Sequence, residues 1–201
     1  MKIKDKTTKK YKCTNGFTLV ESLVAISILM IAVTGPMVVA QKGLISAISS
    51  KDQMIAAFLA QDVIEYIKNV RDSNGVKANA LGETLPDEWL SGLGGIECIG
   101  STPDLVCNVD TLHNGLLSSS VSPQMCIERS VGGQFLGYGV GDSSTCVSSK
   151  FFRYIKIKRV NDETTGKPAD EAYIDVLIKW GTGADQQFRI GSYVYNYWGN
   201  L

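Results

Sequence analysis

The fold is decided by residues 16–40, which read GFTLVESLVAISILMIAVTGPMVVA. From Phe17 to Ala40 this stretch carries a single charged side chain, that of Glu21. A helix over these 24 residues would be about 36 Å long, enough to cross a hydrocarbon core of about 30 Å with some tilt. The sequence therefore predicts a membrane-spanning helix over residues 17–40.

The segment before the span is strongly basic. Residues 1–16 hold six lysines and one aspartate, and because the chain is neutral overall, the remainder carries a net charge of −5. A basic flank stays on the cytoplasmic side of a membrane, which predicts an N-in orientation with everything after Ala40 outside. The acidic outer portion gives no electrostatic reason to expect nucleic-acid binding.

Two ordinary kinds of apolar segment explain the span less well. A secretory signal peptide has an apolar core of about 7–15 residues and a small-residue cleavage site, and this run is longer and lacks such a site. An ordinary signal anchor fits the length but leaves Glu21 unexplained. An ionisable group in a membrane span costs about 2.5–3.5 kcal/mol at mid-helix, so it needs a partner. No cationic residue lies within the span, so we expect a positive charge on another chain.

The junction between leader and span has a specific pattern: a lysine-rich leader, Gly16, FTLVES at residues 17–22, and a continuous apolar run. This pattern resembles the signal of type IV prepilins, shared by pilins and the pseudopilins of type II secretion. The resemblance implies that prepilin peptidase cleaves between Gly16 and Phe17 and methylates the new amine of Phe17. It also implies that Glu21 pairs with the terminal amine of a neighbouring subunit.

The same resemblance implies the remaining partners and the location. The partners are other pilin subunits, an inner-membrane assembly platform, and membrane lipid before assembly, with no cofactor. The subunit is expected to wait as a single-pass protein of the inner (cytoplasmic) membrane, head outside. It then joins an extracellular or periplasmic filament.

Gly35 and Pro36 interrupt the span near its end. Proline lacks a backbone donor and clashes with the preceding turn, so the pair predicts a kink or local unwinding. Members of the resembled family commonly have a helix-breaking residue here, and their filament forms can lose helix there. A kink without functional consequence is the other interpretation.

A helical period continues after the span. In residues 41–71 apolar side chains recur at steps of three and four, with one gap at Lys51–Asp52. These apolar positions are Leu44, Ile48, Ile55, Phe58, Leu59, Val63, Tyr66, Ile67 and Val70. The polar run Asp72–Gly75 predicts the end of the helix. We expect one helix over residues 17–72 whose second half packs against a sheet, since a coiled-coil stalk would need a strict heptad.

The head, residues 73–201, begins with a stretch that is hard to interpret. Residues 73–150 hold 12 of the 20 glycines, a composition that favours loops and short elements. Four cysteines lie here, while Cys13 lies in the leader; an even four in an oxidising compartment predicts two disulfides. Short loops close most readily, which favours the pairs Cys98–Cys107 and Cys126–Cys146, with free thiols or mixed pairing as the alternative.

Known chemical motifs are missing from the head. The glycine-rich run 132–141 lacks phosphate-loop spacing and predicts a turn or irregular strand. His113 is the only histidine and has no sequence neighbours that build a metal site, so we expect an exposed loop residue and no metal. Asp162, Glu163 and Asp170 could hold calcium, as a loop in some pseudopilins does, but a solvated turn explains them better. We find no catalytic constellation, and the sequence predicts no enzyme.

From residue 151 the pattern changes to period two. It predicts strands over 151–160, 172–180 and 188–197 with turns between them, an antiparallel sheet within residues 151–198. One face of such a meander can cover the amphipathic helix. The predicted fold class is α+β: a long N-terminal helix, transmembrane in its first half, packed on a C-terminal antiparallel meander, as in pilin heads.

The end of the chain carries a second likeness. The V-x-[IL]-x-W pattern at residues 176–180 and the aromatic terminus at 193–198 resemble minor pilins of the V type or I-type pseudopilins. We therefore expect a minor pilin of a type IV pilus or related filament, with a type II secretion pseudopilin as the alternative. A membrane-anchored binding protein that uses its exposed tyrosines is a further alternative, but it leaves Gly16, Phe17 and Glu21 without a purpose.

Overall fold

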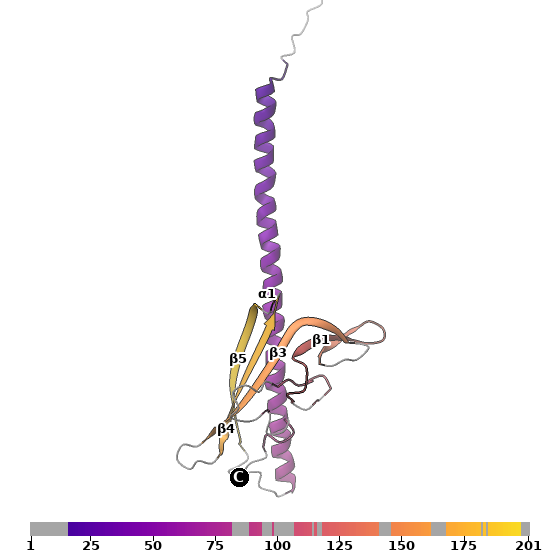
Figure 1. Cartoon of the computed structure of the whole chain (residues 1–201), viewed down its shortest axis with the longest axis vertical. Coiled ribbons are helices and arrows are strands. Elements are labelled where there is room, and N and C mark those ends of the chain that lie inside the picture. The colour runs from indigo at the N-terminus through magenta and orange to yellow at the C-terminus, as the bar shows by residue number, and fades with distance from the viewer. Residues whose placement is uncertain are drawn as a thin grey trace, which may run out of the picture. The chain divides into compact units, whose positions relative to one another are not determined.

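We describe the fold from a computed structural model (Figure 1). The described residues are 16–81, 89–93, 98, 107–113, 115, 118–140, 146–161, 168–181, 183 and 185–197. One helix, α1 (Leu19–Leu81), is followed by five strands. The chain divides into two compact units, residues 1–49 and 50–201, so residues 50–81 of α1 belong to the same unit as the sheet.

The first unit is helical and has no core of its own among its described residues. Every side chain from Leu19 to Ile48 is exposed. The most apolar window of α1 has a mean hydropathy of 2.4, and by length and composition the helix could cross a membrane. None of the residues that the structure describes covers this surface.

Gly35 and Pro36 do not end the helix. α1 runs through both residues, so the predicted unwinding is not seen in this structure. Pro36 cannot donate to the carbonyl of Ala32, four residues earlier, but the loss of this one hydrogen bond does not end the helix. Thr34 Oγ1 donates to the carbonyl of Ile31 at 3.3 Å, one turn before the proline.

A five-stranded antiparallel sheet dominates the second unit, in the order β2-β1-β3-β4-β5. The strands are β1 (Gln124–Arg129), β2 (Phe135–Gly139), β3 (Cys146–Asn161), β4 (Pro168–Trp180) and β5 (Gln186–Tyr195). The last three are the predicted strands; all three start earlier than expected, and β5 ends at Tyr195 rather than at residue 197. β1 was not predicted because it is short, whereas β2 lies within the glycine-rich run 132–141, for which the sequence predicts a turn or irregular strand. Residues 130–134 turn between them, with Gly133 at a φ of 79°.

The core lies between the second half of α1 and the inner face of the sheet. Alternate residues of β3 and β4 point inward, as the period-two pattern predicts. The helix contributes Ala56, Leu59, Ala60, Val63, Ile64 and Ile67, all at most 6% exposed. The gap in the helix pattern also has an explanation: Asp52 is buried because Lys150 of β3 pairs with it, Nζ to Oδ2 at 2.5 Å. The predicted α+β arrangement, a long helix on an antiparallel sheet, is confirmed.

The predicted helix end at Asp72–Gly75 is wrong, because α1 continues to Leu81. Gly75 and Ala78 are buried, so the extra turns pack against the head. Asn74, expected as part of a stop signal, instead donates its side-chain amide to the carbonyls of Trp89 (3.1 Å) and Ser91 (2.7 Å). Long-range contacts thus extend the helix past a local stop signal.

Candidate functional site

Three sequence-predicted site residues, Gly16, Phe17 and Glu21, lie at the start of α1. Thr18 caps the helix: its hydroxyl accepts a hydrogen bond from the Glu21 backbone N–H at 3.3 Å. The run Thr18–Glu21 is therefore the threonine-to-glutamate spacing of a capping box. Glu21 is exposed and lies in the first turn of the helix, at the positive end of the helix dipole. Gly16 and Phe17 precede the cap and are exposed, so the peptide bond between them is accessible.

The cap gives Glu21 a physical setting that the sequence pattern alone did not show. Cleavage before Phe17 would place a new ammonium group at the end of a helix that already carries a partial positive charge. A carboxylate in the first turn offsets that repulsion, and a second carboxylate from a neighbouring chain could do the same. Glu21 is thus positioned to interact with cations at this end of the helix, whichever chain supplies them.

The rest of the first unit presents large apolar side chains. Between residues 19 and 33 they are 49–80% exposed. They are Leu19, Val20, Leu23, Val24, Ile26, Ile28, Leu29, Met30, Ile31 and Val33. Contiguous apolar surface of this extent marks a membrane or protein contact. This part of the molecule can do what the sequence predicts: sit in lipid or pack against other apolar helices.

A buried arginine joins three parts of the head. Arg153 of β3 is 0% exposed. Its Nε donates to Asn108 Oδ1 at 2.9 Å, Nη2 donates to the Val109 carbonyl, and Nη1 lies 3.5 Å from the Leu59 carbonyl of α1. Burial lowers the pKa of Arg153 to about 10, against the opposing effect of the Asp62 carboxylate at 3.5 Å. Arg153 therefore fastens the 107–113 segment and the helix to the sheet.

The sequence analysis missed this role, although a signal was present. Arg153 lies at the same phase of the period-two pattern as Phe151 and Ile155, both of which point into the core. A charged residue on the inward phase of a strand is almost always paired when buried. The pattern therefore indicated that Arg153 needed polar partners inside the head.

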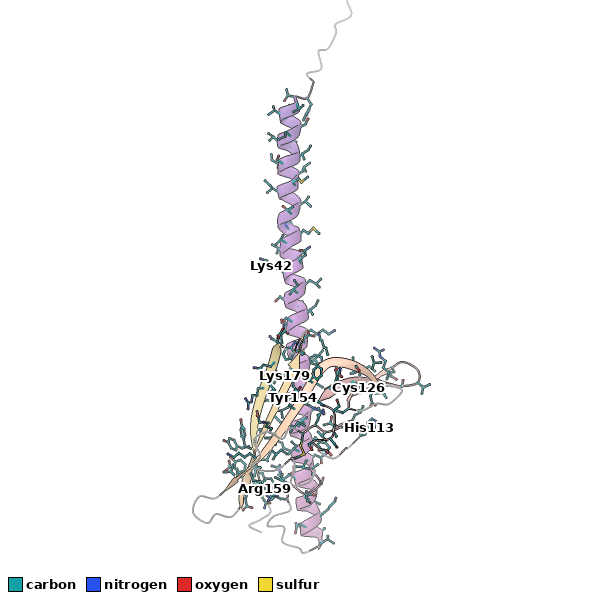
Figure 2. All side chains as sticks on the ribbon, in the orientation of Figure 1. Lys42, His113, Cys126, Tyr154, Arg159 and Lys179 are labelled. Carbon is teal, nitrogen blue, oxygen red and sulfur yellow. A yellow bond between two sulfur atoms is a disulfide. The ribbon has the colours of Figure 1, made fainter. Side chains whose placement is uncertain are left out.

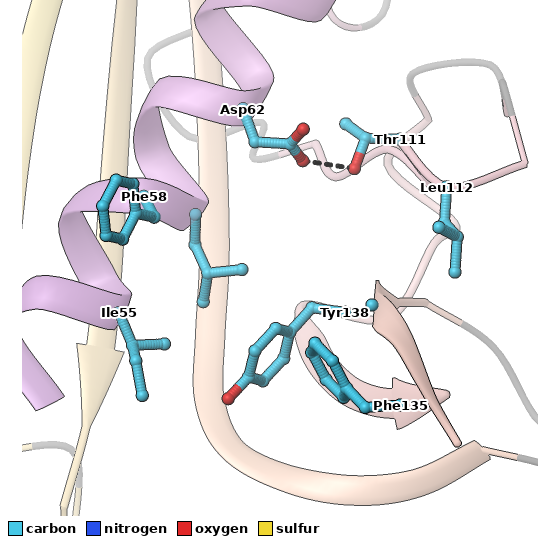
Figure 3. Close-up of a pocket in the computed structure, with 9 residues that line it drawn as sticks. Ile55, Phe58, Asp62, Thr111, Leu112, Phe135 and Tyr138 are labelled. Atoms are coloured by element: carbon cyan, nitrogen blue, oxygen red, sulfur yellow. Dashed lines mark hydrogen bonds between the residues drawn. The ribbon is translucent and has the colours of Figure 1, made fainter. Parts of the chain in front are cut away.

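A hollow of about 360 Å³ opens on the head between α1, the turn at 111–112 and β2 (Figure 3). We call it the apolar hollow. It is lined by Ile55, Phe58, Leu59, Asp62, Thr111, Leu112, Phe135, Gly137 and Tyr138. Phe58 was expected in the core but is 62% exposed at its edge. Asp62 and Thr111 are hydrogen-bonded to each other at the polar end. The hollow has the size and polarity to take an apolar side chain.

The four cysteines of the head form the two favoured pairs. The Cα atoms of Cys98 and Cys107 are 5.8 Å apart, and those of Cys126 and Cys146 are 5.5 Å apart, both ordinary for disulfides. The second pair joins β1 to β3. The first lies beside the core, since Cys107 also forms an isolated bridge with Ile155 of β3.

Aromatic side chains gather on the outer face of β4 and β5. The rings of Tyr173 and Tyr193 are 4.9 Å apart across the two strands. Gly191 is covered by Tyr173, whose hydroxyl and ring occupy the space that a Cβ would need. Arg71 lies over the ring of Tyr197 at 5.2 Å. Tyr173 and Tyr193 are therefore part of the packing of the outer face, whereas Tyr197, beyond the end of β5, contacts Arg71 of α1.

His113 lies in a more elaborate setting than the sequence suggested. It is exposed, as predicted, but Asp110 lies on one side of its ring and Glu128 of β1 on the other (Figure 2 labels His113). The hydrogen bond with Asp110 and the charges of both carboxylates raise the pKa of His113. The calcium hypothesis cannot be followed in the same way, since Asp162 and Glu163 fall outside the described residues.

One comparison with known proteins gives a match. Residues 11–35 match the family model described as the prokaryotic N-terminal methylation motif. No curated protein and no solved structure matches the chain. The matched segment contains Gly16, Phe17 and Glu21, the exposed residues at the start of α1.

Proposed function

Since its N-terminal methylation motif marks this chain as a type IV prepilin-like protein, we propose that it is a minor pilin of a type IV pilus or related filament. The motif implies processing by prepilin peptidase and assembly with other pilin subunits. The observation that carries the proposal is the exposed Gly16–Phe17 bond directly before a capped helix whose apolar residues are uncovered from Leu19 onward.

The proposed sequence of events follows from charge and hydrophobicity. The chain inserts with its lysine-rich leader, residues 1–16, on the cytoplasmic side and its head outside. The peptidase removes the leader and methylates Phe17. On the assembly platform the apolar helix then leaves the lipid and packs against the helices of other subunits. The head thereby becomes part of an extracellular or periplasmic filament.

Glu21 is proposed to guide that exchange. A carboxylate that leaves the membrane surface for an apolar bundle is destabilised unless it meets a cation. The amine created at Phe17 of a neighbouring subunit supplies one. A subunit docked in the wrong register would leave both charges unpaired, so the pair favours one stagger between subunits.

A pseudopilin of type II secretion is the second candidate. The likeness of residues 176–180 and 193–198 to I-type pseudopilins as well as to V-type minor pilins favours it. The two candidates share processing and helix packing. A deletion in the cell distinguishes them. Deletion of a minor pilin reduces surface filaments, whereas deletion of a pseudopilin stops secretion and leaves pili intact.

Mass spectrometry of the natural N-terminus tests the proposal. We expect a chain that begins with methylated Phe17. A Gly16→Leu variant should keep its leader, while the matched Gly43→Leu variant should be processed normally, because neither glycine has heavy atoms within 4 Å of an added Cβ. An intact Met1 on the membrane-bound protein, with the peptidase present, would refute the proposal.

The role of Glu21 has its own test. Glu21→Val and Glu21→Gln should insert and be cleaved but should be depleted from sheared filaments at least tenfold. Glu65→Val is the control, since Glu65 is an exposed carboxylate further along the same helix. Normal incorporation of the Glu21 variants would contradict the proposed pairing of Glu21. It would not contradict the proposed processing of the leader.

A further inference from the structure

The cluster around His113 has the geometry of a metal site that the sequence did not reveal. Asp110 and His113 lie in one turn, and Glu128 comes from β1. His113 Nδ1 lies 2.9 Å from Asp110 Oδ2, and Nε2 lies 3.5 Å from Glu128 Oε2. One ligand atom of each residue lies within 4.8 Å of the others. The two ring nitrogens therefore face two carboxylates of different character.

The contact on the Nδ1 side is a hydrogen bond of ordinary length. The same Asp110 carboxylate also accepts the backbone N–H groups of Leu112 at 3.1 Å and His113 at 3.3 Å. Asp110 thus fixes both the turn and the plane of the imidazole. A carboxylate that holds one ring nitrogen of a histidine is the usual partner of a histidine that binds metal through its other nitrogen.

The contact on the Nε2 side is too long for a strong hydrogen bond. Charge-assisted N–H···O bonds measure about 2.7–2.9 Å, and this separation is 3.5 Å. Two ligands at about 2.0–2.1 Å from one tetrahedral Zn²⁺ lie about 3.3–3.4 Å apart. The observed spacing of His113 Nε2 and Glu128 Oε2 is close to that value. An ion could bind between them with little movement of either side chain.

Glu128 is the independent reason to look for a ligand here. The residue is 6% exposed, and its carboxylate points toward His113. Its Oε1 lies 3.8 Å from Cys146 Sγ, but that sulfur belongs to a disulfide and has no proton to donate. A Cβ on Gly139 would be 2.6 Å from the same oxygen, so the carboxylate fits only because residue 139 is glycine. Burying an acid in this way is costly unless a cation compensates it.

We propose that His113 Nε2 and Glu128 Oε2 are two ligands of a divalent transition-metal site, with Zn²⁺ as the ion best suited to it, and that Asp110 orients the imidazole. Imidazole and carboxylate together suit Zn²⁺, whereas Mg²⁺ and Ca²⁺ prefer oxygen ligands alone. The side chain of His113 is 60% exposed, so the remaining coordination positions of the ion would face solvent. A bound ion would tie the 110–113 turn to β1 next to the Cys126–Cys146 disulfide.

The competing explanation is a protonated imidazole between two carboxylates, without any metal. Both explanations use the same three side chains. They differ in whether His113 Nε2 carries a proton or binds a metal ion. Because metal ligands must be deprotonated, binding is to be measured at about pH 8, where protons compete least.

The test uses the full chain in detergent, purified without a polyhistidine tag and carrying Cys13→Ser, because a free thiolate also binds Zn²⁺. His113 is the only histidine, so its imidazole NMR signals report binding without assignment ambiguity. We expect titration with ZnCl₂ to shift these signals at one equivalent, with at least tenfold weaker effect from CaCl₂ or MgCl₂. Co²⁺ should bind the same site and give visible absorption.

Substitutions assign the ligands. Because loss of His113 removes the NMR probe, affinities are compared by isothermal titration. His113→Gln and Glu128→Gln should each weaken Zn²⁺ binding at least tenfold, and Asp110→Asn by about 10–100-fold through the orientation of the ring. Glu65→Gln, an exposed carboxylate on α1, should change nothing. Since a substitution at buried Glu128 can disturb folding, the exposed His113→Gln variant carries the decision. Unshifted imidazole signals at millimolar Zn²⁺, or unchanged affinity in His113→Gln, would overturn the proposal.

Discussion

The two halves of α1 are one continuous helix with opposite surroundings. From Leu19 to Ile48 every side chain is exposed, whereas from Ala56 to Ile67 one face is 0–6% exposed against the sheet. From Ser22 to Ala40 the first half has no charged side chain, whereas the second half alternates apolar and polar faces. The second half has its partner within the chain, and the first half needs lipid or other chains.

This difference indicates which residues determine the stability of the head and which determine assembly. Contacts within residues 50–201, including the Arg153 hydrogen bonds and both disulfides, should set the stability of the head. Residues 19–48 should contribute little to it, because every side chain there is exposed. Substitutions in the two halves should therefore have separable effects.

The largest expected effect comes from charging the first half. Ile28→Lys combined with Ile31→Lys puts two cations near the middle of the span, at a cost of about 5–7 kcal/mol on insertion scales. The double variant should lose its resistance to alkaline extraction from membranes. Its head should unfold at the same urea concentration, followed by the fluorescence of buried Trp89 and Trp180. Val131→Lys, a fully exposed apolar position in the head, is the control.

The second largest effect is the opposite: the head loses stability while membrane anchoring is kept. Arg153→Ala should destabilise the head by about 3–5 kcal/mol, because it leaves a cavity and removes the donors of buried oxygens, while membrane anchoring stays unchanged. Arg189→Ala should cost at most about 1 kcal/mol, since the Arg189–Asp175 pair is exposed on its arginine side. Urea unfolding in detergent measures both. A loss below about 1 kcal/mol in Arg153→Ala would show that water replaces its hydrogen bonds.

The same contrast explains what sequence could predict. The span, the Gly16–Glu21 motif, strands β3–β5 and the disulfide pairs depend on local pattern or short spacing, and the sequence indicated them. The end of α1, the pairing of β1 with β3, and the cluster at His113 depend on contacts between distant residues. Asn74 binds the carbonyl of Trp89, and Glu128 approaches His113 only because β1 pairs with β3. No local pattern contains that information.

The disulfides should differ modestly in their contributions. In the chain-entropy model a loop of 20 residues stabilises by about 3 kcal/mol and one of 9 residues by about 2.5 kcal/mol. Replacing both cysteines of Cys126–Cys146 by serine should therefore cost slightly more than the same change in Cys98–Cys107. Both double variants should remain anchored in membranes. Urea midpoints in the reverse order would indicate that local packing, rather than loop length, sets the difference.

The smallest expected effect tests packing on the outer face of the sheet. Gly191→Val in β5 should cost about 1 kcal/mol, because the new side chain displaces the Tyr173 ring that covers the glycine. In a Tyr173→Ala background the obstacle is absent, and valine should be neutral or stabilising because it favours strands. The sign change between the two backgrounds is a coupling energy between residues in direct contact. The same cost in both backgrounds would mean that the strained element is the β5 backbone itself and that Tyr173 merely lies above it.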